Sequence, residues 1–401
     1  MGGNRSYGFK SLVFGSFREL IVFFALFAVS ATAWSAQVNV AGFAFAGDYG
    51  AAAARFPYTY KIFEAQRTAQ KTLSPFSVAI NGRAVGIQNV DYKFTADSRS
   101  ALKNSDQALM SVLVLTGETV SVEQFGSYYK TFVSLRGDAL IFDYKSQTIV
   151  RSCPLSVVLF DASPTKPAEG SIAGFVIDLL NREDGRGLVT QYVRCLERAT
   201  VPREGALKVQ VRTGDVSPEA LALMPESLRK NPSTANAMLA DALASILSSK
   251  LGISMLPTSI GHAGHEMTMR LDSGDDVKLK LEEGDFVFDV KLNKLVKIKT
   301  AENNISTAFV YGAYMSMRFS EPGLGTQFIE TDLKNGENAV VPLDKLNGDD
   351  FSAYQDAIRG LFLKFADAIQ KPESKWITTS ASVKNIDAQM ELARITLRKC
   401  K

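Results

Sequence analysis

The strongest constraint on the fold is a run of short segments with alternating side chains between residues 111 and 160. Alternation of apolar and polar residues is typical of antiparallel strands that bury one face. The expected strands are 111–116, 118–125, 128–135, 139–144 and 148–160, with polar connections at Arg136-Gly137-Asp138 and Lys145-Ser146-Gln147. This part of the chain therefore predicts a mainly antiparallel sheet.

Amphipathic helices follow these strands. The first is expected at 171–180, where apolar residues recur at the spacing of one helix face, and similar stripes are expected at 188–199, 235–251 and 351–369. A chain of 401 residues is too long for one ordinary core. The predicted class is α+β, with two related modules, each a mainly antiparallel sheet packed against amphipathic helices.

The sequence also indicates how the chain is divided. We expect a secretory signal peptide at 1–36, a first α/β module at 37–202, a second α/β module at 203–372 and a C-terminal helical tail at 373–401. The boundary between the modules is placed at the loop that contains Pro202 and Gly205, because proline and glycine interrupt regular structure.

An internal repeat supports two related modules. Phe142-Asp143 and Val150-Arg151 in the first half recur as Phe288-Asp289 and Val296-Lys297 in the second, at an offset of 146 residues. Each copy is interpreted as a hairpin with a polar turn between Asp and Val. The alternative is that two unrelated hairpins share this pattern by chance.

A module with a hairpin built around Phe142-Asp143 or Phe288-Asp289 resembles the small α/β modules of bacterial envelope proteins. Examples are the N-terminal domain of TolB, the curli secretion lipoprotein and the outer-membrane activators of peptidoglycan synthases. The resemblance implies assembly and protein recognition rather than catalysis. Those lipoproteins carry a cysteine directly after the signal, whereas the first cysteine here is Cys153.

The first 36 residues read as a secretory signal peptide. Arg5, Lys10 and Arg18 precede an apolar run from Leu20 to Val29, and small residues up to Ala36 offer a cleavage site. The expected location is therefore the periplasm or the cell exterior. An uncleaved signal anchor is the competing interpretation. No later segment is long and apolar enough to span a membrane, so we expect no transmembrane span after cleavage.

The chain has three cysteines. In an oxidising compartment, Cys153 and Cys195 are the natural disulfide pair, and two buried free thiols are the alternative. Cys400 is left over, which makes it a candidate for an intermolecular disulfide or an inert thiol at a frayed end.

The only two histidines lie in one short segment. His262, His265 and the adjacent Glu266 form a candidate metal site. The alternative is a solvated loop, because Gly261 and Gly264 disfavour a helix that would align the histidines. We find no G-x-S-x-G or nucleotide-binding motif, and no cofactor is predicted.

Two aromatic-rich stretches offer a candidate binding surface. Tyr58 and Tyr60 lie in one stretch, and Tyr311 and Tyr314 lie in the other. Exposed aromatic rings are common in interfaces and in sugar-binding sites. Packing of these rings inside the core is the alternative.

The formal net charge is only +3, which gives no reason to expect nucleic-acid binding. The interpretation that agrees with all these observations is an exported, non-enzymatic envelope protein that binds other envelope proteins or assists their assembly. The alternatives are a metal-assisted hydrolase that uses His262, His265 and Glu266, and a module that binds cell wall or carbohydrate.

Overall fold

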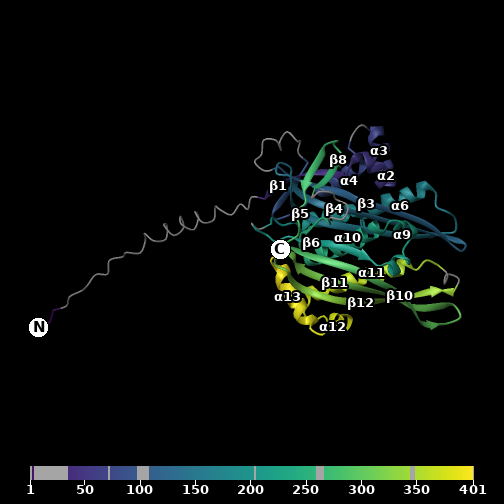
Figure 1. The fold of residues 1–401 in the computed structure, drawn as a ribbon. Helices are drawn as coiled ribbons and strands as arrows, with labels where there is room; N and C mark the ends of the chain where they lie inside the picture. The colour runs from purple at the N-terminus through teal and green to yellow at the C-terminus, as the bar shows by residue number, and fades with distance from the viewer. Residues whose placement is uncertain are drawn as a thin grey trace.

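The structure is a computed structural model that describes residues 2–3, 35–70, 73–96, 108–202, 205–258, 266–343 and 348–400. It is an α+β fold with two sheets and two modules (Figure 1). Most of the predicted signal peptide lies outside the described residues. Within them, no helix has the length and apolar content that crossing a bilayer requires.

The sheet of the first module has the strand order β2-β1-β3-β4-β5. Its strands are β1 (Ala36–Ala46), β2 (Tyr92–Thr95), β3 (Leu109–Phe125), β4 (Tyr128–Asp143) and β5 (Thr148–Ser163). Its helices are η1 (Tyr49–Ala51), α2 (Ala52–Arg55), α3 (Pro57–Gln70), α4 (Pro75–Ala84), α6 (Glu169–Asn181) and α7 (Leu188–Glu197). β1 is parallel to β2 and β3, and β3, β4 and β5 form an antiparallel meander.

The sheet of the second module has the order β7-β6-β10-β11-β12. Its strands are β6 (Val209–Val216), β7 (Met255–Leu256), β10 (Phe286–Glu302), β11 (Ser306–Glu321) and β12 (Thr326–Pro342). Its helices are α8 (Pro218–Leu221), α9 (Glu226–Lys230), α10 (Pro232–Leu251), η2 (Pro322–Leu324), α11 (Phe351–Gln370), α12 (Lys375–Ser380) and α13 (Ile386–Arg398). β6 is parallel to β7 and β10, and β10, β11 and β12 are antiparallel.

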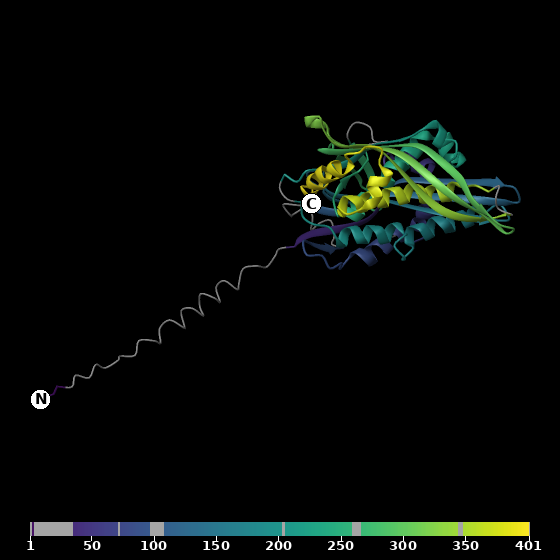
Figure 2. The ribbon, with the colours of Figure 1, turned by 90° about the horizontal axis from the view of Figure 1, so that it is seen from below.

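The two modules therefore share one topology, which confirms the prediction of related modules. The long strands of the meanders start at residues 109, 128 and 148 in the first module and at 286, 306 and 326 in the second, a spacing of 177 or 178 residues. In both views the long strands of the two sheets extend toward the same side of the molecule (Figures 1 and 2).

The predicted repeat register of 146 residues is wrong. Phe142-Asp143 ends β4 just before the turn to β5, as expected. Phe288-Asp289 instead lies near the start of β10, and that strand continues without a turn to Glu302. The two Phe-Asp pairs therefore occupy positions that are not equivalent, and the shared letters reflect the apolar-polar alternation of strands in general.

A hairpin from the second half of the chain joins the first sheet. β8 (Glu266–Leu271) pairs with β1, and β9 (Asp276–Lys280) touches β5 at Thr148. The hairpin buries a small apolar cluster against β1, β3 and β4. The predicted boundary near residue 202 falls between α7 and β6, but segments on both sides of it contribute to the seven-stranded sheet.

The elements stack in layers. α3, α4, α6 and α7 cover one face of the first sheet. α10 and α11 cover the inner face of the second sheet and also contact the first sheet, where Phe351 of α11 packs against Phe132 and Phe160. These two helices therefore lie between the sheets (Figure 1).

Candidate functional site

The described residues contain a large cleft beside the outer edge of β5. Its volume is about 960 Å³. One wall is formed by α6 and α7, and the other by α10 and α11. Residues 153–156 and 158–161 of β5 line it. Because neighbouring residues of a strand point to opposite faces, this nearly continuous lining means that the strand presents its edge to the cleft.

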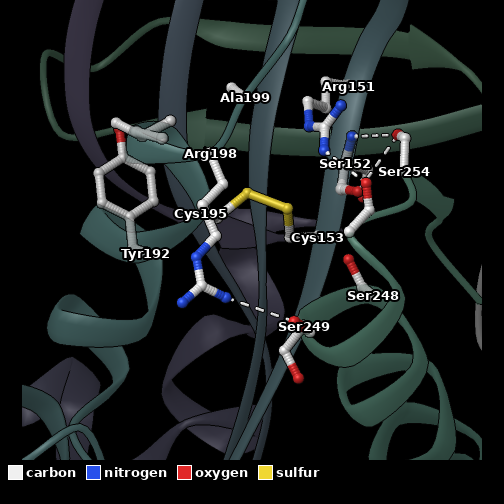
Figure 3. The surroundings of a disulfide bond; sticks show 12 residues. Arg151, Ser152, Cys153, Tyr192, Cys195, Arg198, Ala199, Ser248, Ser249 and Ser254 are labelled. Carbon is white, nitrogen blue, oxygen red and sulfur yellow. Dashed lines mark hydrogen bonds between the residues drawn. A yellow bond between two sulfur atoms is a disulfide. The ribbon is translucent and has the colours of Figure 1, made fainter. Parts of the chain in front are cut away.

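Hydrogen bonds at Ser152 show which residues of β5 point their backbone N–H and C=O groups away from β4. The Ser152 backbone N–H donates to Ser254 Oγ at 3.1 Å, and Ser254 Oγ donates to the Ser152 carbonyl oxygen at 3.3 Å (Figure 3). The backbone of Ser152 therefore faces away from β4. β5 pairs with β4 in continuous register from Arg151 to Ser163, so every second residue after Ser152 also faces away.

The edge is open along the cleft. By this alternation, Ser156, Val158 and Phe160 direct their backbone N–H and C=O groups into it. In the part of the chain that the structure describes, β9 reaches β5 only at Thr148, and no backbone hydrogen bond from another element reaches these three residues. An unpaired strand edge is a ready template for a further strand.

A disulfide closes one end of the cleft. It joins Cys153 of β5 to Cys195 of α7, with 6.4 Å between the Cα atoms, and confirms the predicted pairing (Figure 3). The bond closes a loop with a sequence separation of 42. In the chain-entropy model such a loop contributes about 3–4 kcal/mol to stability. The disulfide fixes the α7 wall against the strand.

Arginines surround this end. Arg198 follows α7 and donates from Nη1 to the Ser249 carbonyl oxygen of α10 at 3.3 Å, which links the two walls (Figure 3). Arg151 is only 7% exposed and donates to Thr200 Oγ1 at 3.1 Å. Its buried Nε has no hydrogen-bond partner among the described residues. Burial lowers the pKa of Arg151.

The lining of the cleft carries an excess of positive charge. Seven basic and three acidic side chains line it. Arg182 pairs with Asp178, and Lys250 pairs with Asp367 at 3.1 Å. Four lining arginines have no described carboxylate within the 4.0 Å of an ion pair, namely Arg151, Arg194, Arg198 and Arg359, and of these Arg359 interacts electrostatically with Asp356 of the same lining. The cleft is therefore suited to an anionic ligand.

The predicted metal site cannot be placed. His262 and His265 lie outside the described residues, and Glu266 is an exposed residue at the start of β8. Among the described residues, no three His, Cys, Asp or Glu side chains are grouped so that they could hold a metal ion. The site at His262, His265 and Glu266 therefore stays a prediction.

The four predicted binding tyrosines are not brought together. Tyr58 and Tyr60 lie on α3 and pack against the first core. Tyr311 is buried in the second core, where its hydroxyl donates to Asp350 Oδ1 at 2.6 Å. Tyr314 on β11 is 39% exposed. These rings belong to different modules and do not form one surface.

The structure does not support an intermolecular disulfide at Cys400. The thiol is 7% exposed in the second core, because α13 docks its apolar stripe there and draws the end of the chain inward. Burial raises the pKa of Cys400 to about 12. A protonated and covered thiol is a poor nucleophile for disulfide exchange.

The sequence did not predict the arginine-lined cleft. Its basic residues come from segments that are far apart, from Arg151 to Arg359, and only the fold brings them together. One local signal was present. Four arginines lie between residues 182 and 198 in and around α7, namely Arg182, Arg186, Arg194 and Arg198.

Comparisons with known proteins show no family. No protein-family model and no curated protein sequence matches the chain. Among solved structures, the chain is weakly similar to a Helicobacter pylori protein described as a homolog of a neuraminyllactose-binding hemagglutinin. The identity is 15% and the TM-score is 0.26, over 48% of this chain and 91% of that chain. This likeness is too weak to support an argument, and the resemblance to envelope α/β modules is not confirmed.

Proposed function

We propose that this chain is an exported, non-enzymatic binding protein of the cell envelope, and that its cleft receives a segment of a partner protein. The observation that carries the proposal is the cleft itself, in which an open strand edge lies between two helical walls with excess positive charge. Protein recognition commonly uses such edges, because backbone hydrogen bonds supply affinity there.

The chemistry of the cleft favours binding over catalysis. Its two cysteines are joined in the disulfide and supply no thiolate. One carboxylate of the cleft, Asp178, is held in an ion pair with Arg182 and is therefore not a free base. The described lining contains no histidine to act as a general base. Arginines that stay protonated are suited to holding anionic groups rather than to transferring protons.

Two features support export. The basic and apolar segments of the first 36 residues have the order of a signal peptide. The disulfide between Cys153 and Cys195 suits a periplasmic or extracellular location, because cytosolic thiols are kept reduced.

Site-specific photo-cross-linking of the full chain in its native cells tests this function. A photoreactive residue is placed at Ser245 in the α10 wall, with Val90, an 85% exposed residue outside the cleft, as the control. We expect a discrete protein adduct from position 245 and none from position 90. The adduct should disappear in the Arg194→Glu, Arg359→Glu variant. Equal adducts from both positions, or none from the cleft, would contradict the proposal.

A further inference from the structure

We propose that the occupant of the cleft is an acidic, extended segment of the partner, which adds to the open edge of β5 as a further strand. This inference rests on the proposed function and specifies the chemistry of the ligand. The segment would exchange backbone hydrogen bonds with Ser156, Val158 and Phe160. Its carboxylates would pair with the cleft arginines that have no described carboxylate within ion-pair distance.

The space beside β5 has the form that an added strand requires. α6 and α7 pack on the face that carries Leu155 and Val157, whereas α10 and α11 pack on the face that carries Val158 and Phe160. Both helical layers also line the cleft beyond the edge of the strand. A strand placed about 4.8 Å from β5 would therefore be covered on both faces.

The second module shows this type of pairing within the chain itself. β12 is the counterpart of β5, and its outer edge forms an antiparallel bridge between Leu333 and Ala381. The Ser382 N–H donates to the Asp332 carbonyl oxygen at 2.9 Å, and the Asp332 N–H donates to Ser382 Oγ at 3.0 Å. The segment before α13 thus occupies the edge that β5 leaves open. Among the described residues, the chain fills this edge in the second module, whereas in the first module β9 reaches β5 only at Thr148, outside the cleft.

The charges of the walls select an acidic segment. Arg194 and Arg198 are four residues apart at the end of α7, so they project from one side of that wall. Arg359 lies on the opposite wall, in α11. Side chains of an extended peptide alternate between its two faces, so carboxylates on both faces would meet arginines. A basic segment would be repelled.

Peptide binding to the full, oxidised chain provides the test. The probe is a labelled eight-residue peptide that repeats Glu-Glu-Val-Val, so that each face of the extended peptide carries glutamates, and its binding is measured by fluorescence anisotropy. Two matched probes replace glutamate by lysine, or valine by proline, which keeps the negative charge but removes backbone donors. We expect the valine-glutamate peptide to bind at least tenfold more tightly than either matched probe.

Two variants separate the backbone contribution from the charge contribution. Val158→Pro removes one N–H that faces the cleft, and the strand should accept it because Pro154 already occupies an equivalent position. Val340→Pro at the exposed edge of β12 is the matched control. We expect the affinity to fall at least tenfold in Val158→Pro. The double variant that combines Arg194→Gln with Arg359→Gln should lose at least as much, and the control should be unchanged. Circular dichroism verifies that each variant is folded.

The outcomes distinguish this inference from the proposed function. Unchanged affinity in folded Val158→Pro, or equal binding of the proline-containing peptide or of a sulfated polysaccharide, would overturn strand addition. If one of these results occurs but a protein adduct still forms from the cleft in cells, strand addition is wrong and the proposed binding of a partner still holds. Binding of the valine-glutamate peptide that Val158→Pro abolishes supports strand addition, even where no partner adduct forms.

Discussion

At the scale of single residues, the contact between the modules depends on buried charges. Arg136 of β4 pairs with Asp241 of α10 at 2.8 Å, and Thr258 donates to the other carboxylate oxygen at 2.8 Å. Asp138 is buried close by. The sequence predicted a polar connection between two strands at Arg136-Gly137-Asp138, but β4 runs straight through these residues. Arg136 can be buried in this strand because Asp241 of the second module pairs with it.

Breaking this pair should strongly destabilise the protein. In Asp241→Ala, the Arg136 guanidinium stays buried without its carboxylate, so the free energy of unfolding should fall by about 3–5 kcal/mol. The control is Glu169→Gln, which removes an exposed pair with Lys61 and should change the free energy by less than about 1 kcal/mol. Chemical denaturation measures both. Equal small losses would show that the buried pair does not connect the modules.

Asp138 should make stability depend on pH. Burial, and then the charge of Asp241, hold the pKa of Asp138 well above its ordinary value in the folded protein. The folded state therefore binds this proton more tightly than the unfolded state, and stability falls as the pH rises from about 4 through the raised pKa. We expect Asp138→Asn to lose this fall in denaturation series at several pH values. If Asp138→Asn and the unsubstituted protein lose stability in parallel as the pH rises, other groups cause the pH dependence.

At the scale of secondary structure, periodic apolar spacing predicted the helices well. The helix expected at 351–369 is α11 (Phe351–Gln370), and the one at 171–180 is α6 (Glu169–Asn181). Strands were predicted less well. β12 was not expected, because it is an edge strand whose buried positions include polar residues such as Thr331 and Asn335. The apolar residues Phe76, Val78 and Ile80 alternate before Asn81-Gly82, a pattern that predicts a strand and a turn, but Ser74 caps the helix α4 there.

The packing of α10 on β6 depends on a glycine. A Cβ atom at Gly214 would lie 2.4 Å from the Asn236 carbonyl oxygen of α10. Gly214→Ala must push the helix away from the strand, so we expect a loss of about 1–3 kcal/mol. Gly174 in the exposed face of α6 has no neighbour within 4 Å, and Gly174→Ala should stabilise by about 0.5–1 kcal/mol. Thermal unfolding that moves both variants in the same direction would contradict this packing.

At the scale of the whole molecule, two copies of one topology face each other across α10 and α11 (Figure 1). The sequence predicted two α+β modules and the disulfide, because apolar periodicity and the number of cysteines can be taken from the sequence without knowing which distant segments meet. It did not predict the correct repeat spacing, the hairpin of β8 and β9 on the first sheet, or the cleft. These features bring together residues that are distant in the chain, as Cys153 and Arg359 in the lining of the cleft show.

The proposed export predicts where the mature chain starts. The signal peptide should be removed between Ala33 and Ala36, so that the protein begins close to Trp34 or Gln37. The described fold begins with β1, whose first residue, Ala36, lies at the end of this window. Mass spectrometry of the protein from its native cells measures the N-terminus. An intact Met1 would indicate an uncleaved anchor instead.

Hydrogen exchange at the open edge of β5 tests whether a peptide adds to it as a strand. The full, oxidised chain is measured with and without the valine-glutamate peptide. We predict that the amides of Ser156, Val158 and Phe160 gain strong protection, whereas those of Val157 and Leu159, which face β4, change little. Unchanged exchange at these three amides in the peptide-saturated protein, with protection confined to α7 and α11 or to the β12 edge, would contradict strand addition.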